Sequence, residues 1–169
     1  MFEEARRKYR PETVNILLIA EAPPRIESRR FFYFENVRDQ DSLYLETMKV
    51  IYPGDYIDTR YLSENKADFL NRFKLDGYYL LDAANTTIRD IKKKKEQLRA
   101  DLPDLIGRIN RVINQETKII LISRPVYDVC FMPLKTAAFN VINTEMIDFP
   151  GSGGQVKYRN KMNRLLTGV

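Results

Sequence analysis

The sequence predicts an α/β domain built on a mainly parallel sheet. Short apolar runs rich in Ile, Leu and Val occur at 14–20 and 118–123, a composition typical of buried parallel strands. Charged or amphipathic stretches of helical length separate the expected strands, as in chains that alternate strands with helices. The 169 residues are 44% hydrophobic, enough for one packed core, so we expect a single domain over 1–169.

Each element follows from a local pattern along the chain. A polar helix over 2–10 ends at Pro11, and the first strand ends before Pro23 and Pro24. Asp41 is placed to cap the helix that follows it, because its side chain can accept a hydrogen bond from a first-turn N–H. The expected strands are 14–20, 78–82, 118–123 and 141–143, and the expected helices are 2–10, 41–52, 63–73, 87–114, 125–138 and 155–166.

The chain contains no His and one Cys, and these counts exclude several mechanisms. A Ser-His-Asp triad, a Cys-His pair and an HExxH zinc site all need imidazole. Zinc knuckles, four-Cys iron–sulfur clusters and disulfide scaffolds need more than Cys130. We therefore expect no cofactor and no metal. With no apolar run of membrane-spanning length and no signal peptide at the N-terminus, we expect a cytoplasmic protein.

The formal net charge is +5, and the basic excess is concentrated in the segments 85–111 and 150–169. The first contains the run Lys92–Lys95, and the second contains four basic residues and no acidic ones. Such segments are often solvated helix faces. If both face one cleft, a polyanion such as DNA becomes the expected partner.

Ligands of open parallel sheets bind beyond the carboxyl ends of the strands, so the residues there are the candidate site. Glu21 follows the first strand, where a carboxylate can act as a general base or simply accept a loop N–H. Asp82 ends the next strand, and two carboxylates at neighbouring strand ends could instead hold Mg²⁺.

Two further segments lie at this edge. The aromatic cluster at 31–34 is either core packing under a long loop or a stacking platform for a base. The Gly-rich loop 150–155 opens a basic helix, and its N-terminal N–H groups suit a phosphate, although a flexible connector is the alternative. The candidate residues for phosphate contacts are Gly151, Ser152, Gly153, Gly154, Gln155, Lys157 and Arg159.

The order of these motifs resembles the uracil-DNA glycosylase superfamily. ILLIAEAPPRIESRRFF at 16–32 is similar to a strand followed by the GEAPG segment of the thermophilic branch. GYYLLDAANTTIR at 77–89 is similar to the GVLLLN-x-x-LT-x-R segment. FPGSGGQVKYRNKM at 149–162 is similar to the loop that opens the last helix of these enzymes.

The resemblance implies a three-layer α/β/α sandwich with a central four-stranded, mainly parallel sheet. It implies a DNA-repair enzyme that flips a damaged or deaminated base out of the duplex and hydrolyses its N-glycosidic bond. On this basis Glu21 activates water, Phe31 or Phe32 stacks on the base, Asp82 reads the base edge with Asn85 as a possible substitute, and 151–154 press on the DNA backbone.

The chain departs from the family pattern at three positions. Ala20 stands in place of Gly, and Phe149 stands where many members have the His that stabilises the departing uracil anion. Asp82 replaces Asn, and an ionised carboxylate only accepts hydrogen bonds, so bases that present donors suit it better than uracil.

Three hypotheses remain open from the sequence. The first is a base-excision glycosylase of altered specificity that acts through Glu21. The second is the same fold used as a nucleic-acid or nucleotide binding module with little or no catalysis. The third is a metal-dependent phosphoester enzyme that uses Glu21 and Asp82 as ligands.

Overall fold

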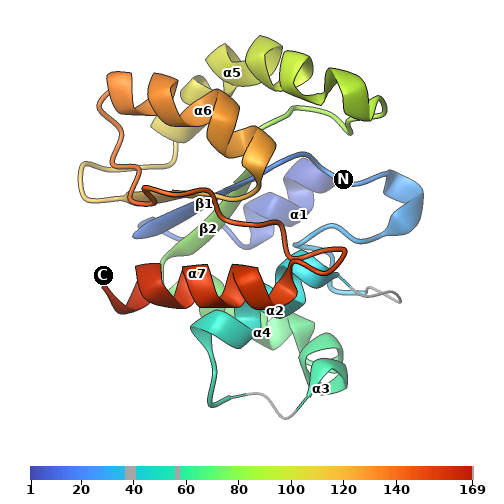
Figure 1. The fold of residues 1–169 in the computed structure, drawn as a ribbon. Helices are drawn as coiled ribbons and strands as arrows, with labels where there is room; N and C mark the ends of the chain where they lie inside the picture. The colour runs from blue at the N-terminus through green and yellow to red at the C-terminus, as the bar shows by residue number, and fades with distance from the viewer. Residues whose placement is uncertain (37–40, 56–57, 169) are drawn as a thin grey trace.

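The structure is a computed structural model, and it describes residues 1–36, 41–55 and 58–168. Figure 1 shows strands enclosed by helices. The elements of the described residues, in chain order, are α1 (Phe2–Lys8), β1 (Ile16–Ala20), the 3₁₀ turn η1 (Ile26–Ser28), α2 (Ser42–Ile51), α3 (Thr59–Glu64), α4 (Lys66–Leu75), β2 (Tyr78–Asp82), the 3₁₀ turn η2 (Ile91–Lys93), α5 (Lys94–Asn110), β3 (Lys118–Leu121), α6 (Arg124–Thr136) and α7 (Gln155–Thr167).

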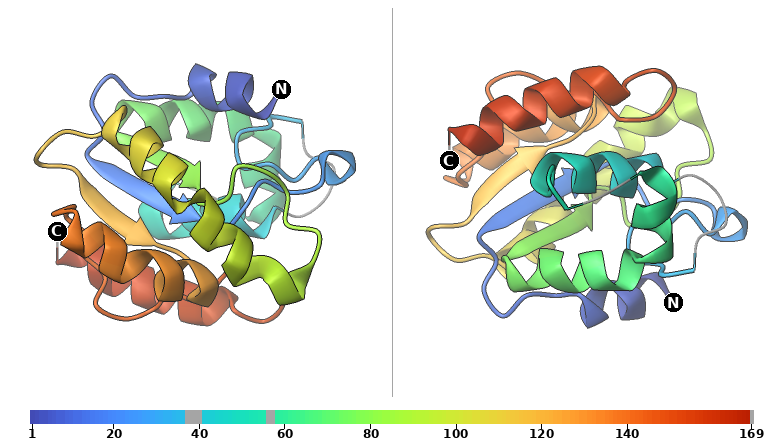
Figure 2. Two further views of the ribbon diagram at one scale, coloured as in Figure 1. Left: turned by 90° about the horizontal axis from the view of Figure 1, so that it is seen from above. Right: turned by 90° about the horizontal axis from the view of Figure 1, so that it is seen from below.

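The sheet is parallel, in the order β2-β1-β3, which confirms the predicted α/β class. In register, Leu18 of β1 lies beside Leu80 of β2 and Ile120 of β3. Helices lie on both faces of the sheet: α5 and α6 on one side, α2, α4 and α7 on the other (Figures 1 and 2). The carboxyl ends of β1 and β2 therefore lie together at one edge, as the candidate site requires.

The prediction of a fourth strand is wrong for the described residues. The segment after α6 meets β3 only through two isolated parallel bridges, Ile119 with Val141 and Ile122 with Ile147. Between them the buried Asn143 side chain replaces a backbone rung, accepting from Leu121 N–H at 3.0 Å and donating to the Leu121 carbonyl at 3.1 Å. An amide side chain can satisfy a strand edge as a backbone can, so the sheet stops at three strands.

Helix boundaries also differ from the predicted ones. The helix expected over 63–73 is two helices, α3 and α4, and Ser63 lies inside α3 with its hydroxyl donating to the Thr59 carbonyl at 3.0 Å. Asp41 caps α2 as predicted, since its carboxylate accepts from Tyr44 N–H at 3.2 Å. The predicted cap is confirmed because the acceptor, Asp41, lies directly before the first residue of α2.

Side chains cover the outer edge of β2, which pairs with β1 alone among the described strands. The Tyr33 hydroxyl accepts from Leu80 N–H at 2.7 Å and lies 3.2 Å from the Leu80 carbonyl. Arg108 Nη1 donates to the Asp82 carbonyl at 2.7 Å. These bonds occupy backbone groups that an exposed edge would offer to another strand. None of the helices in the described part of the chain has the length and apolar character needed to cross a bilayer.

The core makes a stability prediction at the centre of β1. Leu18 is fully buried between both helix layers, so Leu18→Ala should lower the free energy of unfolding by about 2–5 kcal/mol through lost burial and a residual cavity. The matched control is Leu75→Ala, because Leu75 is 83% exposed, and its effect should stay within about 0.5 kcal/mol. Urea denaturation of both variants measures the difference, and equal losses would contradict this view of the core.

Candidate functional site

A cavity of about 570 Å³ opens beyond the carboxyl ends of β1 and β2. It takes residues from all three segments that resemble the glycosylase motifs, although these segments lie far apart in the sequence. Its lining consists of Ala20, Glu21, Ala22, Pro24, Arg30, Phe31, Phe32, Asp41, Ser42, Leu43, Leu80, Asp82, Lys94, Phe149, Gly151 and Ser152. The volume falls in the range of sites that hold small molecules, and a nucleobase fits within it.

Glu21 projects into this cavity directly after β1. Its backbone carbonyl accepts from Ala84 N–H at 3.0 Å, which ties the end of β1 to the segment after β2. Its carboxylate forms an ion pair with the Nζ of Lys94, the first residue of α5. Both side chains remain about one-fifth exposed, so water reaches the pair. A carboxylate held at the wall of a wet cavity can accept a proton from water.

Asp82 is the last residue of β2 and is 4% exposed. Its Oδ2 accepts from Arg6 Nη2 at 2.7 Å, and the Oδ1 has no hydrogen-bond partner among the described residues. Burial disfavours the ionised form and raises the pKa of Asp82 to about 6, while the Arg6 guanidinium opposes that rise. Asp82 therefore changes charge near neutral pH, with one oxygen available to the cavity.

Phe31 and Phe32 are core residues that also border the cavity. Phe31 is 1% exposed and packs on Phe2 with ring centroids 4.7 Å apart, while Phe32 packs on Phe73 at 5.4 Å. The core packing considered from the sequence is therefore confirmed for both rings. Their neighbours hold them in place, and together they form an apolar part of the cavity wall.

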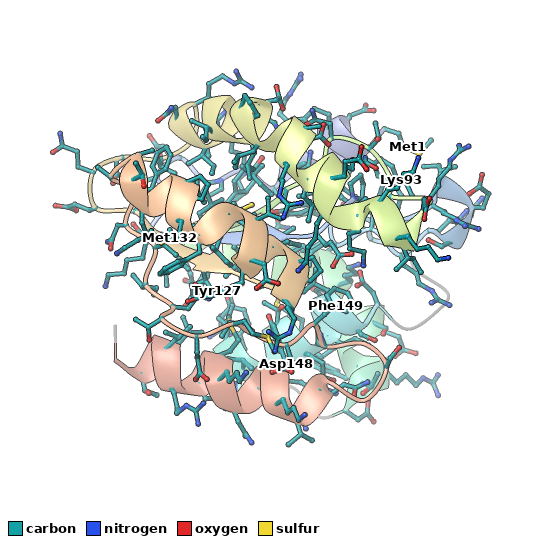
Figure 3. The ribbon with its side chains drawn as sticks, turned by 45° about the horizontal axis from the view of Figure 1, so that its top comes forward. Met1, Lys93, Tyr127, Met132, Asp148 and Phe149 are labelled. Atoms are coloured by element: carbon teal, nitrogen blue, oxygen red, sulfur yellow. The ribbon has the colours of Figure 1, made fainter. Side chains whose placement is uncertain are left out.

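Phe149 and two residues of the Gly-rich loop, Gly151 and Ser152, also line the cavity. Phe149 is 44% exposed and lies in the segment leading to α7 (Figure 3). A Cβ on Gly151 would come within 3.0 Å of the Phe149 ring, and one on Gly154 would meet the Phe149 carbonyl at 2.1 Å. Gly151 and Gly154 therefore allow the loop to fold closely over Phe149, while Gly153 supplies a positive φ of 86°.

Several residues predicted for the site lie outside the cavity. Asn85 is exposed, and its backbone N–H donates to Asp101 at 2.9 Å. Gly153, Gly154 and Gln155 do not line the cavity, and Gln155 begins α7. Asn85 thus lies outside the cavity that Asp82 lines.

The basic residues of α7 are mostly engaged in ion pairs. Arg159 pairs with Glu46 of α2, Lys161 pairs with Asp148 at 2.8 Å, and Arg164 pairs with Glu145 at 2.9 Å. Lys157 is exposed, and within the described chain it forms no hydrogen bond or ion pair. Among the four basic residues of α7, the Lys157 side chain is therefore the one outside these ion pairs.

The sequence reasoning missed three charged residues at the site. Lys94 belongs to a run of four lysines, and only its position after β2 hinted that one of them would reach the sheet edge. Arg6, the partner of Asp82, comes from α1, which carried no functional signal. Lys66 pairs with the cavity residue Asp41 at 3.0 Å, and both side chains are buried. Long-range pairs of this kind depend on chain folding, which local patterns do not encode.

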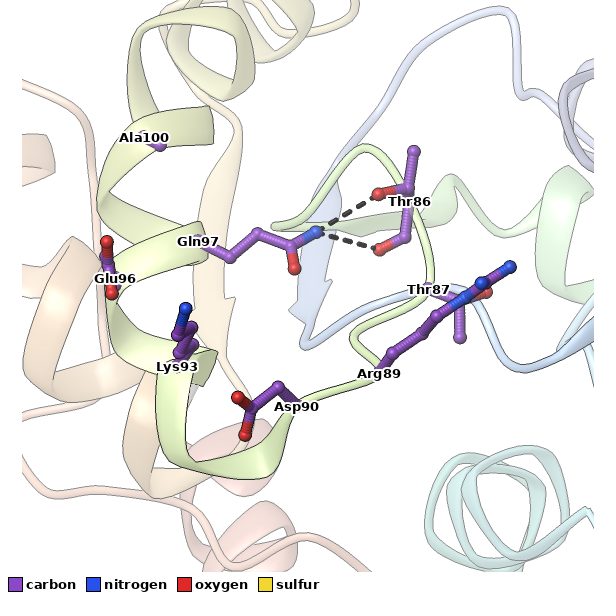
Figure 4. Close-up of a pocket in the computed structure, with 8 residues that line it drawn as sticks. All are labelled: Thr86, Thr87, Arg89, Asp90, Lys93, Glu96, Gln97 and Ala100. Atoms are coloured by element: carbon purple, nitrogen blue, oxygen red, sulfur yellow. Dashed lines mark hydrogen bonds between the residues drawn. The ribbon is translucent and has the colours of Figure 1, made fainter.

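A second hollow lies beside the first residues of α5 and is drawn in Figure 4. Its volume is about 660 Å³, and it is bounded by the segment 86–90 and by α5 residues including Gln97. Gln97 Nε2 donates to Thr86 Oγ1 at 3.1 Å and closes one side. The hollow contains none of the carboxylates or rings at the strand ends, so the candidate site remains the cavity around Glu21 and Asp82.

Comparisons of the chain with protein-family models, with curated proteins and with solved structures found no match. The resemblance to uracil-DNA glycosylases therefore rests on the three motif segments and on where the fold places them. What is established is an α/β fold with a three-stranded parallel sheet.

Asp82 yields a pH prediction. Because its pKa is raised in the folded protein, the folded state binds a proton more tightly than the unfolded chain between about pH 4 and 6. The contribution of Asp82 to stability should therefore fall as pH rises through this window. Asp82→Asn removes that titration, so the unfolding free energy of wild type minus that of the variant should fall between pH 4 and 7, because the other carboxylates contribute equally to both proteins. Chemical denaturation across this range measures both slopes, and identical slopes would contradict the assignment.

Proposed function

We propose that this protein is a base-excision glycosylase that hydrolyses the N-glycosidic bond of a flipped damaged or deaminated base in DNA. The observation that carries the proposal is the convergence of Glu21, Asp82 and the Phe31–Phe32 wall on one base-sized cavity. These groups come from separate segments, and each is the residue to which the motif resemblance gives a role in base binding or hydrolysis. We also propose that the fold is the three-layer α/β/α sandwich of the uracil-DNA glycosylase superfamily. In this chain two isolated bridges beside β3 stand in place of a fourth strand.

The chemistry assigns one role to each group. A water molecule attacks C1′ of the flipped nucleotide, Glu21 accepts a proton from this water, and the base departs with the electron pair of the broken C–N bond. Phe31 and Phe32 supply the apolar wall beside the base. The cations Arg30 and Lys94 line the same cavity, so we assign to them the stabilisation of the departing anion at a site where Phe149 offers no imidazole.

The protonation state of Asp82 bears on which base is bound. Arg6 holds Oδ2, which leaves Oδ1 to meet the base edge. The ionised carboxylate accepts hydrogen bonds and favours amino-bearing edges, as expected from the sequence. The protonated carboxyl both donates and accepts, a pattern that suits the O4 and N3–H of uracil. With a pKa of about 6, Asp82 is protonated below that pH, where it donates and accepts. Above that pH it is ionised and only accepts.

The alternative is a binding module of the same fold with little or no catalysis. The ion pair between Lys94 and Glu21 favours this alternative, because the ammonium occupies a carboxylate oxygen that would otherwise meet the attacking water. The metal-dependent phosphoester enzyme receives no support from the described residues, among which no three His, Cys, Asp or Glu side chains gather as ligands. The three carboxylates of the cavity, Glu21, Asp41 and Asp82, instead face Lys94, Lys66 and Arg6.

The activity test uses duplex oligonucleotides that each carry uracil, hypoxanthine, xanthine or a G:T mismatch. Wild type should release one of these bases in the presence of EDTA, and Glu21→Gln should slow release by about 100-fold or more, because the amide cannot accept the proton. The matched control is Glu27→Gln, an exposed carboxylate of η1 that does not line the cavity and should keep full rate. Release of no base by wild type, with tight duplex binding, would favour the binding module, and loss of release in EDTA would favour the metal enzyme.

DNA binding gives a separate prediction at α7. Lys157 is exposed and outside ion pairs with described residues, so Lys157→Ala should lower the slope of log K against log salt by about one. Arg164→Ala removes an equal charge from the same helix, but Arg164 is held by Glu145, so its slope should change less. Fluorescence anisotropy of a labelled duplex at several salt concentrations measures both. Equal slopes for wild type and Lys157→Ala would assign α7 to the solvated-face interpretation.

A further inference from the structure

A separate cavity of about 380 Å³ lies on the other face of β2. Side chains alternate along a strand, and here Leu80 and Asp82 line the base-sized cavity, while Tyr79 and Leu81 line this one. Its other walls come from α1 and from the carboxyl-terminal part of α5. The lining consists of Glu3, Arg7, Arg10, Tyr79, Leu81, Arg108, Arg111 and Val112, and we call it the arginine cavity.

Four guanidinium groups border the arginine cavity, and two of them are unengaged. The side chains of Arg7 and Arg111 form no hydrogen bond or ion pair within the described part of the chain. Arg10 donates through Nη2 to the Arg111 carbonyl at 2.8 Å, and Arg108 donates to the Asp82 and Ala83 carbonyls at 2.7 and 3.1 Å. These three bonds fix the walls, while the guanidinium groups of Arg7 and Arg111 keep their donors available.

The arginine cavity contains little negative charge. Glu3 is the single carboxylate in the lining, and its Oε2 already accepts from Arg6 Nη1 at 2.6 Å. The cavity thus combines four guanidinium groups with one carboxylate that is engaged elsewhere. An arrangement of this kind concentrates positive potential and attracts small anions.

Tyr79 distinguishes the arginine cavity from an ordinary solvated basic surface. The residue is 3% exposed, yet its hydroxyl has no hydrogen-bond partner among the residues that the structure describes. Burial raises the pKa of Tyr79 to about 12, so the hydroxyl keeps its proton as a donor. The hydroxyl is not among the buried polar atoms that lack a partner, so it reaches the space of the arginine cavity and presents an unused donor there.

We propose that the arginine cavity binds a small diphosphate-bearing anion. Guanidinium groups match phosphate oxygens with paired N–H donors, and Arg7, Arg111 and the Tyr79 hydroxyl present unused donors to one space. Leu81 and Val112 give the same space an apolar part. The volume exceeds that of a diphosphate and leaves room for a group attached to it. The shared chemistry is the diphosphate, whose source is either inorganic pyrophosphate or a nucleoside diphosphate.

Calorimetric titration with pyrophosphate, ADP and adenosine tests the site in the absence of DNA. Pyrophosphate or ADP should bind wild type, and adenosine should not. Tighter binding of ADP would identify the nucleotide as the source, and equal binding would identify the diphosphate alone. The double variant Arg7→Ala/Arg111→Ala should weaken binding at least tenfold, and Tyr79→Phe should weaken it severalfold without lowering thermal stability, because no protein hydrogen bond is lost.

The matched control is Arg60→Ala/Arg99→Ala, which removes the same charge from exposed positions outside the cavity and should keep the wild-type affinity. Equal weakening by the two double variants, or no binding of either phosphate compound to wild type, would overturn the proposal. The site is independent of the glycosylase proposal: Glu21→Gln should bind pyrophosphate normally, and base release by Arg7→Ala/Arg111→Ala reports separately on the other cavity.

Discussion

The burial of β1 is the constraint on which the rest of the structure depends. All five of its residues are buried, with a strand on each side and helices over both faces. A strand without polar alternation is stable only when every side is covered, so β2, β3 and the two helix layers are all required. The same burial ends abruptly at Ala20, and the chain leaves the sheet at Glu21. The strongest apolar run therefore delivers a carboxylate to the edge where ligands bind.

The Arg6–Asp82 pair is the second element that organises the site. Removing two charges from water is costly, and a buried pair of this kind contributes little net stability. It does orient Asp82: one carboxylate oxygen is held by α1 and the other is left toward the cavity. Arg108 adds a bond to the Asp82 carbonyl from the α5 side. The end of β2 is thus held from two helices, which places a titrating carboxyl with little freedom to move.

Strand β2 separates two chemically different cavities. One face carries a carboxyl beside aromatic rings, and the other carries a phenol among arginines. Because Arg108 borders the arginine cavity and also bonds the backbone at Asp82, the two faces share a structural connection through one side chain. The arginine cavity thus gathers basic side chains from α1, from the end of α5 and from the residues that follow these helices, apart from those of α7.

Local patterns predicted much of the fold and part of the site. The apolar runs gave the three strands, Asp41 gave the start of α2, and the strand-end rule selected Glu21, Asp82 and the Phe31–Phe32 pair, which the structure brings to one cavity. The predicted fourth strand was wrong, because beside β3 the Asn143 side chain forms hydrogen bonds that the backbone of a strand would form.

Periodicity and capping are properties of neighbouring residues, so the sequence by itself determined the α/β class, the central strand and the residues at its carboxyl end. Contacts between distant segments were decided only in the tertiary structure. Those contacts pair Lys94 with Glu21 and Arg6 with Asp82, and engage most of α7's cations. They also assemble the arginine cavity from α1, β2 and α5. The physical reason is that which charges meet depends on how helices pack on the sheet, and no local signal in the chain records that packing.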